Sequence, residues 1–350
     1  DVERSRGLGD VYKRQVKKNP ESFLAVDRAE TQFGEEVDTY ADCVYEKADQ
    51  MLREKILEGK FVQDPTPCFY LYELTMDGHS QTGVVGCASI DDYRNNVIKK
   101  HENTRADKEE DRIRHVDTCS MQTGPIFLAY RAKEDLKEKI GELKKQAPVY
   151  DFVSEDGIGH RVWVIDNDSD VAMIEEAFGK IPAIYIADGH HRCASAVKVG
   201  LKRREQYPDY TGEEEFNYFL SVIFPDEELR ILDYNRAVKD LNGMDVATFL
   251  TRIEEYFAVQ KKGQSPYRPT EKGTFGMYLE NEWYSLSAKD EIKSEDAVEG
   301  LDVSLLQNDL LDPILGIMDP KTDKRIDFVG GIRGLGELER RVHTLSLIHI

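Results

Sequence analysis

The sequence is poor in cysteine, and it has neither a paired-cysteine motif nor a long apolar run. Its five cysteines are odd in number and widely spaced, and without a Cys-X-X-Cys pair a zinc ribbon has no support. We expect reduced, mostly buried thiols in a cytoplasmic protein. No apolar stretch approaches the roughly 20 residues of a membrane-spanning helix, so we expect no membrane partner.

Positive charge is also scarce. Lys and Arg number 47 against 67 Asp and Glu, which gives a net charge of -20. This balance opposes binding to nucleic acid, which requires a basic face, but it leaves room for a local basic pocket that holds one nucleotide. Apolar residues make up 40% of the chain, which is enough for a packed core, and the length suggests about two domains.

The two ends of the sequence carry matching signatures. Residues 10–15 (DVYKRQ) and 345–350 (LSLIHI) back-translate to DNA strings that are reverse complements of each other. These strings resemble the transposase mosaic-end adapter that is used to prepare sequencing libraries. We therefore expect residues 1–15 and 345–350 to be translated adapter that takes no part in the packed core, with a native segment at 16–344 that is cut at both ends.

Helical and strand patterns alternate along the native segment, which predicts a mixed α/β or α+β fold. We expect an N-terminal α+β lobe at 16–147, a core at 148–240 and a C-terminal α+β region at 241–344. Within these regions the patterns predict hairpins at 149–165 and 218–234 and an amphipathic helix at 245–258.

The most informative stretch is IYIADGHHRC, residues 184–193. An apolar strand runs into Asp188 and Gly189, and a helix begins just after them. Gly189 permits a turn that other residues adopt only with strain. A strand, a glycine turn and a helix N-terminus favour an anion site, because backbone N–H groups and the positive end of the helix dipole face the ligand. The side chains of His190, His191 and Arg192 add further donors.

Two other interpretations of this stretch stay open. Asp188 can cap the helix while the two histidines pack or face solvent. Alternatively, Asp188 and His190 can hold a metal ion, as in a metal-dependent hydrolase. The second alternative is weaker, because the side chains of adjacent His190 and His191 diverge and the useful i, i+4 spacing of metal-binding histidines is absent.

The segment IADGHHRCASA resembles the signature of a bacterial family catalogued as domain of unknown function 1015, in which ADGHHR recurs. The resemblance is co-linear along nearly the whole native segment. Tyr234–Arg236 (YNR) departs from the Thr-His-Arg triplet of many members. The other matching blocks are NPESFL at 19–24, the charged block from Tyr93 to His115, GPIFLAY at 124–130, LDPILGI at 311–317 and FVGG at 328–331.

The Asp-Gly-His-His-Arg element also resembles the motif of the ParB/sulfiredoxin superfamily, whose members include nucleotide hydrolases, sulfiredoxin and archaeal kinases of free serine. There the equivalent turn binds nucleotide phosphates. The resemblance implies a ParB/sulfiredoxin-like phosphate-binding core at 148–240, centred on Val149–Gly200, with an additional α+β lobe. Asp188 would hold Mg²⁺. The phosphates of ATP or ADP would be cradled by Gly189, His190, His191 and Arg192.

A second charged block supplies candidates for the acceptor side of such a reaction. Phosphoryl transfer needs positioned positive charge and one base for the acceptor hydroxyl. Glu102 is the candidate base or metal partner, and His101, Arg105 and Arg112 are candidate phosphate or structural partners. We expect His101 and Glu102 to lie near His190. The alternative is a network of surface ion pairs around Arg112.

Four functions follow from these patterns. The first is a kinase that transfers phosphate from ATP or ADP with Mg²⁺ to a small hydroxyl-bearing metabolite, such as free L-serine, with Glu102, Asp188 and His190 as catalytic residues. The second is a nucleotide-binding regulator without turnover. The third is a ParB-like nucleotide hydrolase or DNA-associated switch, and the fourth is the metal-dependent hydrolase. We prefer the kinase, because a passive binder needs only the phosphate cradle.

Overall fold

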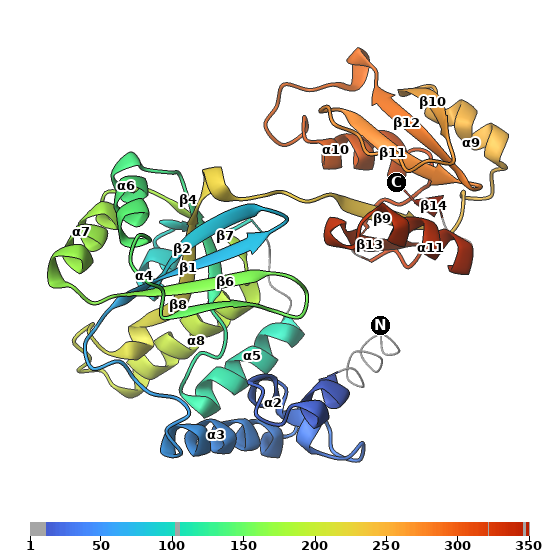
Figure 1. Ribbon diagram of the computed structural model, residues 1–350. Coiled ribbons are helices and arrows are strands. Elements are labelled where there is room, and N and C mark those ends of the chain that lie inside the picture. Colours follow the sequence, from blue (N-terminus) through green and yellow to red (C-terminus); the bar gives the residue numbers. More distant parts are fainter. Residues whose placement is uncertain (1–11, 102–105, 321, 346–347, 350) are drawn as a thin grey trace. The chain divides into compact units, whose positions relative to one another are not determined.

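The computed structural model describes residues 12–101, 106–320, 322–345 and 348–349 (Figure 1). The chain divides into two units, Asp1–Leu229 (unit 1) and Arg230–Ile350 (unit 2). Together they form a mixed α+β protein, which confirms the predicted fold class. The division lies before position 230 instead of at the expected 240. The expected boundary at 147 falls inside unit 1, between strands that pair in one sheet.

Unit 1 is built on a mixed sheet with the strand order β3-β7-β4-β8-β2-β1-β6-β5. Its strands are β1 (Phe69–Met76), β2 (His79–Ser89), β3 (Ile98–Lys99), β4 (Ile126–Tyr130), β5 (Tyr150–Val153), β6 (Gly159–Ile165), β7 (Ile184–Asp188) and β8 (Tyr218–Pro225). Its helices are α2 (Leu24–Asp27), α3 (Asp42–Leu57), α4 (Ile90–Arg94), α5 (Ala106–Cys119), α6 (Glu134–Leu143), α7 (Asp168–Gly179) and α8 (His190–Gln206). Short 3₁₀ turns lie at Ala29–Gln32, Glu215–Asn217 and Asp226–Glu228.

The segment Val149–Gly200 folds into the expected series of hairpin, helix, strand, turn and helix. The hairpin β5–β6 pairs antiparallel over Tyr150–Val153, and helix α7 begins at an Asn167 cap. In the sheet, however, β7 is separated from β6 by β4, β8, β2 and β1. The segment is therefore not a self-contained core, because its strands are joined through strands that come from elsewhere in unit 1.

Two groups of helices pack on this sheet (Figure 1). Helix α8 packs on β4 and β7 through a cluster that includes Cys193, Val197, Leu128 and Ile186. Helices α6 and α7 pack on β1, β2 and β6 through a second cluster, which contains Leu71, Val84, Trp163, Ile140 and Ile174. Helix α3 packs in turn on α2 and on the end of α5, around Val26, Val44, Ala48 and Cys119. Unit 1 thus has several moderate apolar clusters.

Unit 2 is an antiparallel sheet with the strand order β10-β12-β11-β14-β9-β13. Its strands are β9 (Tyr234–Val238), β10 (Phe257–Gly263), β11 (Thr274–Leu279), β12 (Glu282–Ala288), β13 (Ile326–Gly330) and β14 (Ile348–His349). Its helices are α9 (Val246–Ile253), α10 (Asp302–Leu306), a π-helical turn at Gln307–Leu311, a 3₁₀ turn at Gly331–Arg333 and α11 (Leu335–Leu345); a further 3₁₀ turn lies at Asp290–Ile292.

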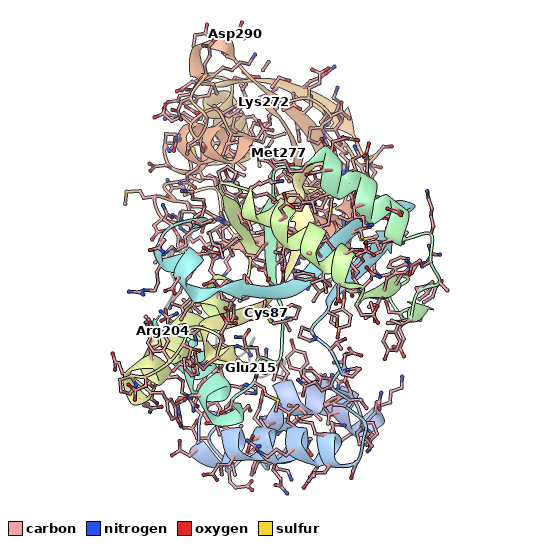
Figure 2. The ribbon with its side chains drawn as sticks, turned by 90° about the vertical axis from the view of Figure 1, so that its left-hand side faces the viewer. Cys87, Arg204, Glu215, Lys272, Met277 and Asp290 are labelled. Carbon is pink, nitrogen blue, oxygen red and sulfur yellow. The ribbon has the colours of Figure 1, made fainter. Side chains whose placement is uncertain are left out.

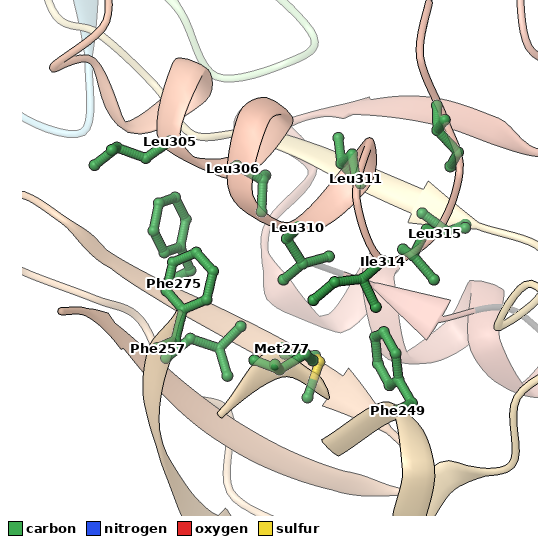
Figure 3. Close-up of a cluster of buried hydrophobic side chains, with 14 of the residues drawn as sticks. Phe249, Phe257, Phe275, Met277, Leu305, Leu306, Leu310, Leu311, Ile314 and Leu315 are labelled. Carbon is green, nitrogen blue, oxygen red and sulfur yellow. The ribbon is translucent and has the colours of Figure 1, made fainter. Parts of the chain in front are cut away.

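The main core of unit 2 is continuous and rich in large apolar side chains. Figure 3 shows Phe249 of α9, Phe257 of β10 and Met277 of β11 facing Leu310 and Leu315 from the segment that follows α10. Strand residues alternate between the two faces of a sheet, so the neighbour of Met277, Tyr278, joins a separate cluster with Trp283 and with Leu338 of α11. Both faces of this sheet are therefore covered by helices.

Two sequence expectations near the junction of the units are wrong. The hairpin expected at 218–234 does not form, because β8 pairs with β2 and β4 in unit 1 whereas β9 pairs with β13 and β14 in unit 2. The helix expected at 245–258 ends at Ile253, and Phe257 begins strand β10 instead. The apolar residues at its end match a strand as well as a helix.

The two chain ends differ in how they compare with the expectation, as far as the described residues reach. Of residues 10–15, the structure describes 12–15, which begin a helical turn and are not buried. Leu345–Ile350 was also expected to take no part in the packed core, but Leu345 ends α11 and Ile348–His349 pairs as β14 with β11 and β9. A short β-prone segment there pairs backbone groups that two neighbouring strands would otherwise leave open.

The cysteines are less buried than expected. Cys119 and Cys193 are buried, whereas Cys43 and Cys87 are exposed and Cys68 is intermediate. Burial raises the pKa of the Cys193 thiol to about 12, so this residue of the ADGHHRC stretch is a packing residue and a poor nucleophile. Among the described helices, none has the length and apolar character that crossing a membrane requires.

Candidate functional site

The ADGHHR stretch forms the strand, turn and helix that the sequence predicts. Strand β7 ends at Asp188, Gly189 adopts a left-handed conformation with φ of 92°, and α8 begins at His190. A Cβ atom at position 189 would also lie only 3.0 Å from the Arg192 guanidinium. The backbone angle therefore favours glycine here, and a larger residue would also displace the Arg192 guanidinium.

Two hydrogen bonds hold Arg192 in place beside this turn. Its Nη1 donates a hydrogen bond to the Pro125 carbonyl oxygen at 2.6 Å, and its Nη2 donates to Asp188 Oδ2 at 2.9 Å. These bonds engage two of the five N–H groups of the guanidinium and fix its plane. Asp188 is 74% exposed, so its carboxylate orients Arg192 from the solvent side.

His190 lies at the base of the turn and is buried, with 6% exposure. The ring of His101 meets it edge to face, with ring centroids 4.3 Å apart. This places His101 next to the motif although 89 residues separate them in sequence, and it confirms the expected proximity. Glu102 and Arg105, the candidate base and a candidate phosphate partner, lie outside the described residues.

A pocket of about 340 Å³ opens beside this turn, and we call it the arginine pocket. Arg192 from α8 and Arg112 from α5 both line it, so the structure brings together two predicted phosphate-binding residues from distant parts of the chain. The charged lining residues are these two arginines and one aspartate, and each arginine is paired with a carboxylate, Arg112 with Asp27 and Arg192 with Asp188. Its other lining residues are Phe23, Leu24, Asp27, His115, Val116, Gln122, Thr123, Gly124 and Ile126.

Asp27 is a pocket residue that sequence reasoning missed. It lies at the end of α2, where Arg112 Nη1 donates to its Oδ1 at 3.3 Å and Thr123 Oγ1 donates to the same oxygen at 3.4 Å. The available signal was its position three residues after the NPESFL block that resembles the family. Asp27 thus holds Arg112 at the pocket as Asp188 holds Arg192.

His115 is the second residue that was missed, although it closes the charged block that begins at Tyr93. Its side chain is buried at 8% exposure, and its Nε2 has no hydrogen-bond partner among the residues that the structure describes. Burial lowers the pKa of His115, against the opposing influence of the Asp27 carboxylate. A neutral imidazole with an unused nitrogen therefore lines the arginine pocket.

The other residues of the ADGHHR motif do not line the arginine pocket. Within the described part of the chain, Asp188, His190 and His191 are absent from the pocket wall. The carbonyl of His191 accepts a hydrogen bond from Ser195 Oγ at 2.7 Å, inside α8. No group of three or more His, Cys, Asp or Glu side chains in the described residues is arranged to hold a metal ion. If Asp188 binds a metal ion, the other ligands of that ion would have to come from a bound molecule such as a nucleotide.

Comparison with known proteins shows which family the chain belongs to. No curated protein and no solved structure matches the chain significantly. A family model does match, over residues 10–304, and it is described as a protein of unknown function (DUF1015). The match covers both the arginine pocket and the ADGHHR turn. The chain therefore belongs to the DUF1015 family, as the sequence predicts, and the predicted blocks at 311–317 and 328–331 lie beyond the match.

Proposed function

We propose that this protein is a nucleotide-dependent phosphotransferase that acts on a small hydroxyl-bearing metabolite, with ATP or ADP as donor, Mg²⁺ as cofactor and free L-serine as the first acceptor to test. One observation carries the proposal. Arg112 and Arg192, from two different helices, line one pocket beside the glycine turn at the N-terminus of α8. Paired guanidinium groups are suited to phosphate oxygens.

The pocket is prepared for an anion before any ligand binds. Each guanidinium is oriented by a carboxylate, Arg192 by Asp188 and Arg112 by Asp27. Preorganised donors of this kind stabilise charge without reorganisation during the reaction. The unused Nε2 of His115 adds a further group that can contact a ligand in the pocket.

Phosphoryl transfer needs little covalent chemistry from the protein, and the remaining roles go to carboxylates. Mg²⁺ in proteins commonly uses one or two carboxylates together with substrate phosphates, which fits the exposed Asp188. Asp27 lines the pocket and Glu102 follows His101, so these two are the candidates to orient the acceptor hydroxyl. The ParB/sulfiredoxin resemblance of the turn supports a nucleotide as the phosphate donor.

The test is nucleotide consumption that depends on an added acceptor. The purified chain is incubated with Mg²⁺ and either ATP or ADP, and a panel of amino acids and sugars that carry hydroxyl groups is added. The proposal expects phosphate transfer with one acceptor class and none in its absence. Hydrolysis without an acceptor would favour a ParB-like hydrolase. Binding without consumption for every acceptor would favour the nucleotide-binding regulator.

A matched pair of variants ties any activity to the pocket. Arg192→Ala removes a guanidinium that lines the arginine pocket and should abolish most of the turnover. Arg131→Ala removes an exposed guanidinium that pairs with Asp226 on the loop after β8, and it should leave turnover unchanged. Equal activity of the two variants would contradict the assignment of the arginine pocket as the phosphate site.

A further inference from the structure

We propose that a second pocket along α8 binds the nucleoside part of the nucleotide whose phosphates occupy the arginine pocket. This inference rests on the proposed function. The second pocket, which we call the α8 pocket, has a volume of about 610 Å³. Val116 and Gln122 line both pockets, so the two hollows adjoin across the end of α5 and the loop that follows it.

One face of α8 runs along both pockets. Arg192 lines the arginine pocket, while Ala196, Val199, Gly200 and Arg203 line the α8 pocket. The intervals between these residues place them on one side of a helix. At 1.5 Å per residue, the eight residues from Arg192 to Gly200 span roughly 12 Å, which is about the reach from the phosphates to the base of an extended nucleotide.

The walls of the α8 pocket suit a flat heterocycle. Aromatic rings come from Tyr207, Phe216 and Tyr218, and aliphatic groups come from Val199 and Leu220. Stacking on aromatic side chains binds any base, because every base has a π-face. A ligand pocket of this kind is mostly apolar with a few polar groups that fix orientation.

Polar groups at the same pocket suit a ribose. Glu213 and Glu215 line it, and carboxylates of this kind accept hydrogen bonds from ribose hydroxyls. Gln122 is a wall residue: its Nε2 donates to the Tyr218 carbonyl at 3.1 Å, and its Oε1 accepts from the Leu220 N–H at 2.6 Å. The amide is thereby tied to β8 where the two pockets adjoin.

The floor of the α8 pocket depends on a close approach of two backbones. A Cβ atom at Gly200 would lie 2.4 Å from the Phe216 carbonyl oxygen, so glycine lets the Glu215–Asn217 turn rest directly on α8. This contact fixes Phe216 at the pocket. The aromatic wall is therefore preformed, which lowers the entropic cost of binding a rigid base.

The distance between the pockets argues against the α8 pocket as the acceptor site. A reacting hydroxyl must approach within about 3–3.5 Å of the phosphorus atom. A small acceptor bound beside Gly200 would be roughly 12 Å from the phosphates at Arg192, at 1.5 Å per residue of helix. A group that binds there is a non-reacting part of the donor, and the acceptor belongs in the arginine pocket.

Cys87 is a native reporter for this inference. It lies on β2, lines the α8 pocket together with Glu215, and has an exposed side chain; Figure 2 labels both residues. Desolvation and the Glu215 carboxylate raise the pKa of its thiol, so alkylation is best followed at alkaline pH. Cys43 on α3 is also exposed and does not line the pocket, which makes it an internal control.

The experiment compares two ligands by mass spectrometry of alkylated peptides. We expect ATP with Mg²⁺ to slow alkylation of Cys87 at least about fivefold while Cys43 reacts at its usual rate, since bound ligand must leave before the thiol is reached. Inorganic tripolyphosphate should bind the arginine pocket and protect neither cysteine. We also expect ATP to bind about tenfold or more tightly than tripolyphosphate.

A variant pair sharpens the comparison. Met121 lines the α8 pocket and is partly exposed, so Met121→Trp fills the pocket from its rim with little risk to folding. We expect this variant to weaken ATP binding about tenfold and to leave tripolyphosphate binding unchanged. Met318→Trp alters an exposed methionine of unit 2 that lies in neither pocket and should change neither affinity.

The outcomes separate the two proposals. Equal binding of ATP and tripolyphosphate, with Cys87 unprotected by either, would overturn the nucleoside assignment while leaving the phosphate site in place. Failure of both ligands to bind would overturn the proposed function and this inference together. Protection of Cys87 by an acceptor molecule in the absence of nucleotide would overturn the nucleoside assignment in favour of an acceptor site.

Discussion

The two units of this protein bury different kinds of side chain. In the described residues, unit 2 buries one large apolar core around Phe249, Phe257 and Met277 and a smaller cluster around Tyr278 and Trp283, and its buried polar side chain is Ser285. Unit 1 divides its apolar residues among several clusters and buries many polar or charged groups, which are Lys55, Glu73, Thr82, Glu109, His115, His190, Ser195, Asn217 and Ser221. Buried polar groups cost stability unless they are paired, so we infer that unit 2 is organised for packing and unit 1 for chemistry.

The largest effect should come from the core of unit 2. Phe249 has no exposed surface and belongs to the cluster in Figure 3, where it lies below Ile314. Phe249→Ala should lower the free energy of unfolding of unit 2 by about 3–5 kcal/mol, because it leaves a cavity. Thermal unfolding measures this, with exposed Val303→Ala as the control. ATP affinity in unit 1 should not change; if it fell with the stability of unit 2, the separation of roles would be wrong.

The next effect concerns the arginine pocket. Arg192→Ala should weaken tripolyphosphate binding about 10- to 100-fold, as expected when a charge-assisted hydrogen bond to phosphate worth about 1.5–3 kcal/mol is lost. Arg192→Lys should recover only part of the affinity, because an ammonium group cannot keep both bonds to Pro125 and Asp188. Titration calorimetry gives both values. Full affinity in the alanine variant would show that phosphate binds elsewhere.

A third effect tests a buried charge that lies away from the pocket. Glu73 is 4% exposed, and its carboxylate pairs with Lys144 at 2.5 Å and with Arg161 at 3.5 Å. Lys144→Ala should destabilise unit 1 by about 2 kcal/mol, because it removes the nearer partner of a buried charge. Adding Glu73→Gln should restore part of the loss by removing that charge. A double variant less stable than the single one would contradict this account.

The smallest effect is a pH dependence through His115. Burial holds the pKa of His115 below its ordinary value, so the folded protein favours the neutral ring. The contribution of His115 to the stability of unit 1 is then fully present above the unfolded pKa of about 6.5. It falls as the pH drops below that value, because the unfolded chain takes up the proton first. His115→Gln should flatten this part of the curve of melting temperature against pH. An unchanged slope would assign the effect to other groups.

The local parts of the site could be read from the sequence because they depend on neighbouring residues. An apolar strand, Gly189 and an alanine-containing helix predict one turn geometry, and the structure has it. The proximity of His101 to His190 came from the family-like block and is correct. The order of strands in the sheet could not be predicted from the sequence. Four strands lie between β7 and β6, and this placement depends on long-range pairing that periodicity does not encode.

The missed pocket residues have a similar explanation. Asp27 and His115 come from α2 and α5, and each lies at the edge of a family-like block that does not by itself mark it as a pocket residue. They gain their roles only when these helices pack together beside α8. Residues 348–349 were not expected in the packed core because their sequence resembles an adapter, yet they pair as β14 with β11 and β9.

The most direct test of the phosphotransferase account is phosphorus NMR of the purified chain with ATP, Mg²⁺ and the acceptor panel, run beside the Arg112→Ala, Arg192→Ala double variant. The account predicts a new phosphomonoester resonance that grows with the ADP signals only when the right acceptor is present, and that is absent in the double variant because both guanidinium groups of the arginine pocket are gone. Unchanged ATP with every acceptor, or equal turnover by the double variant, would contradict it.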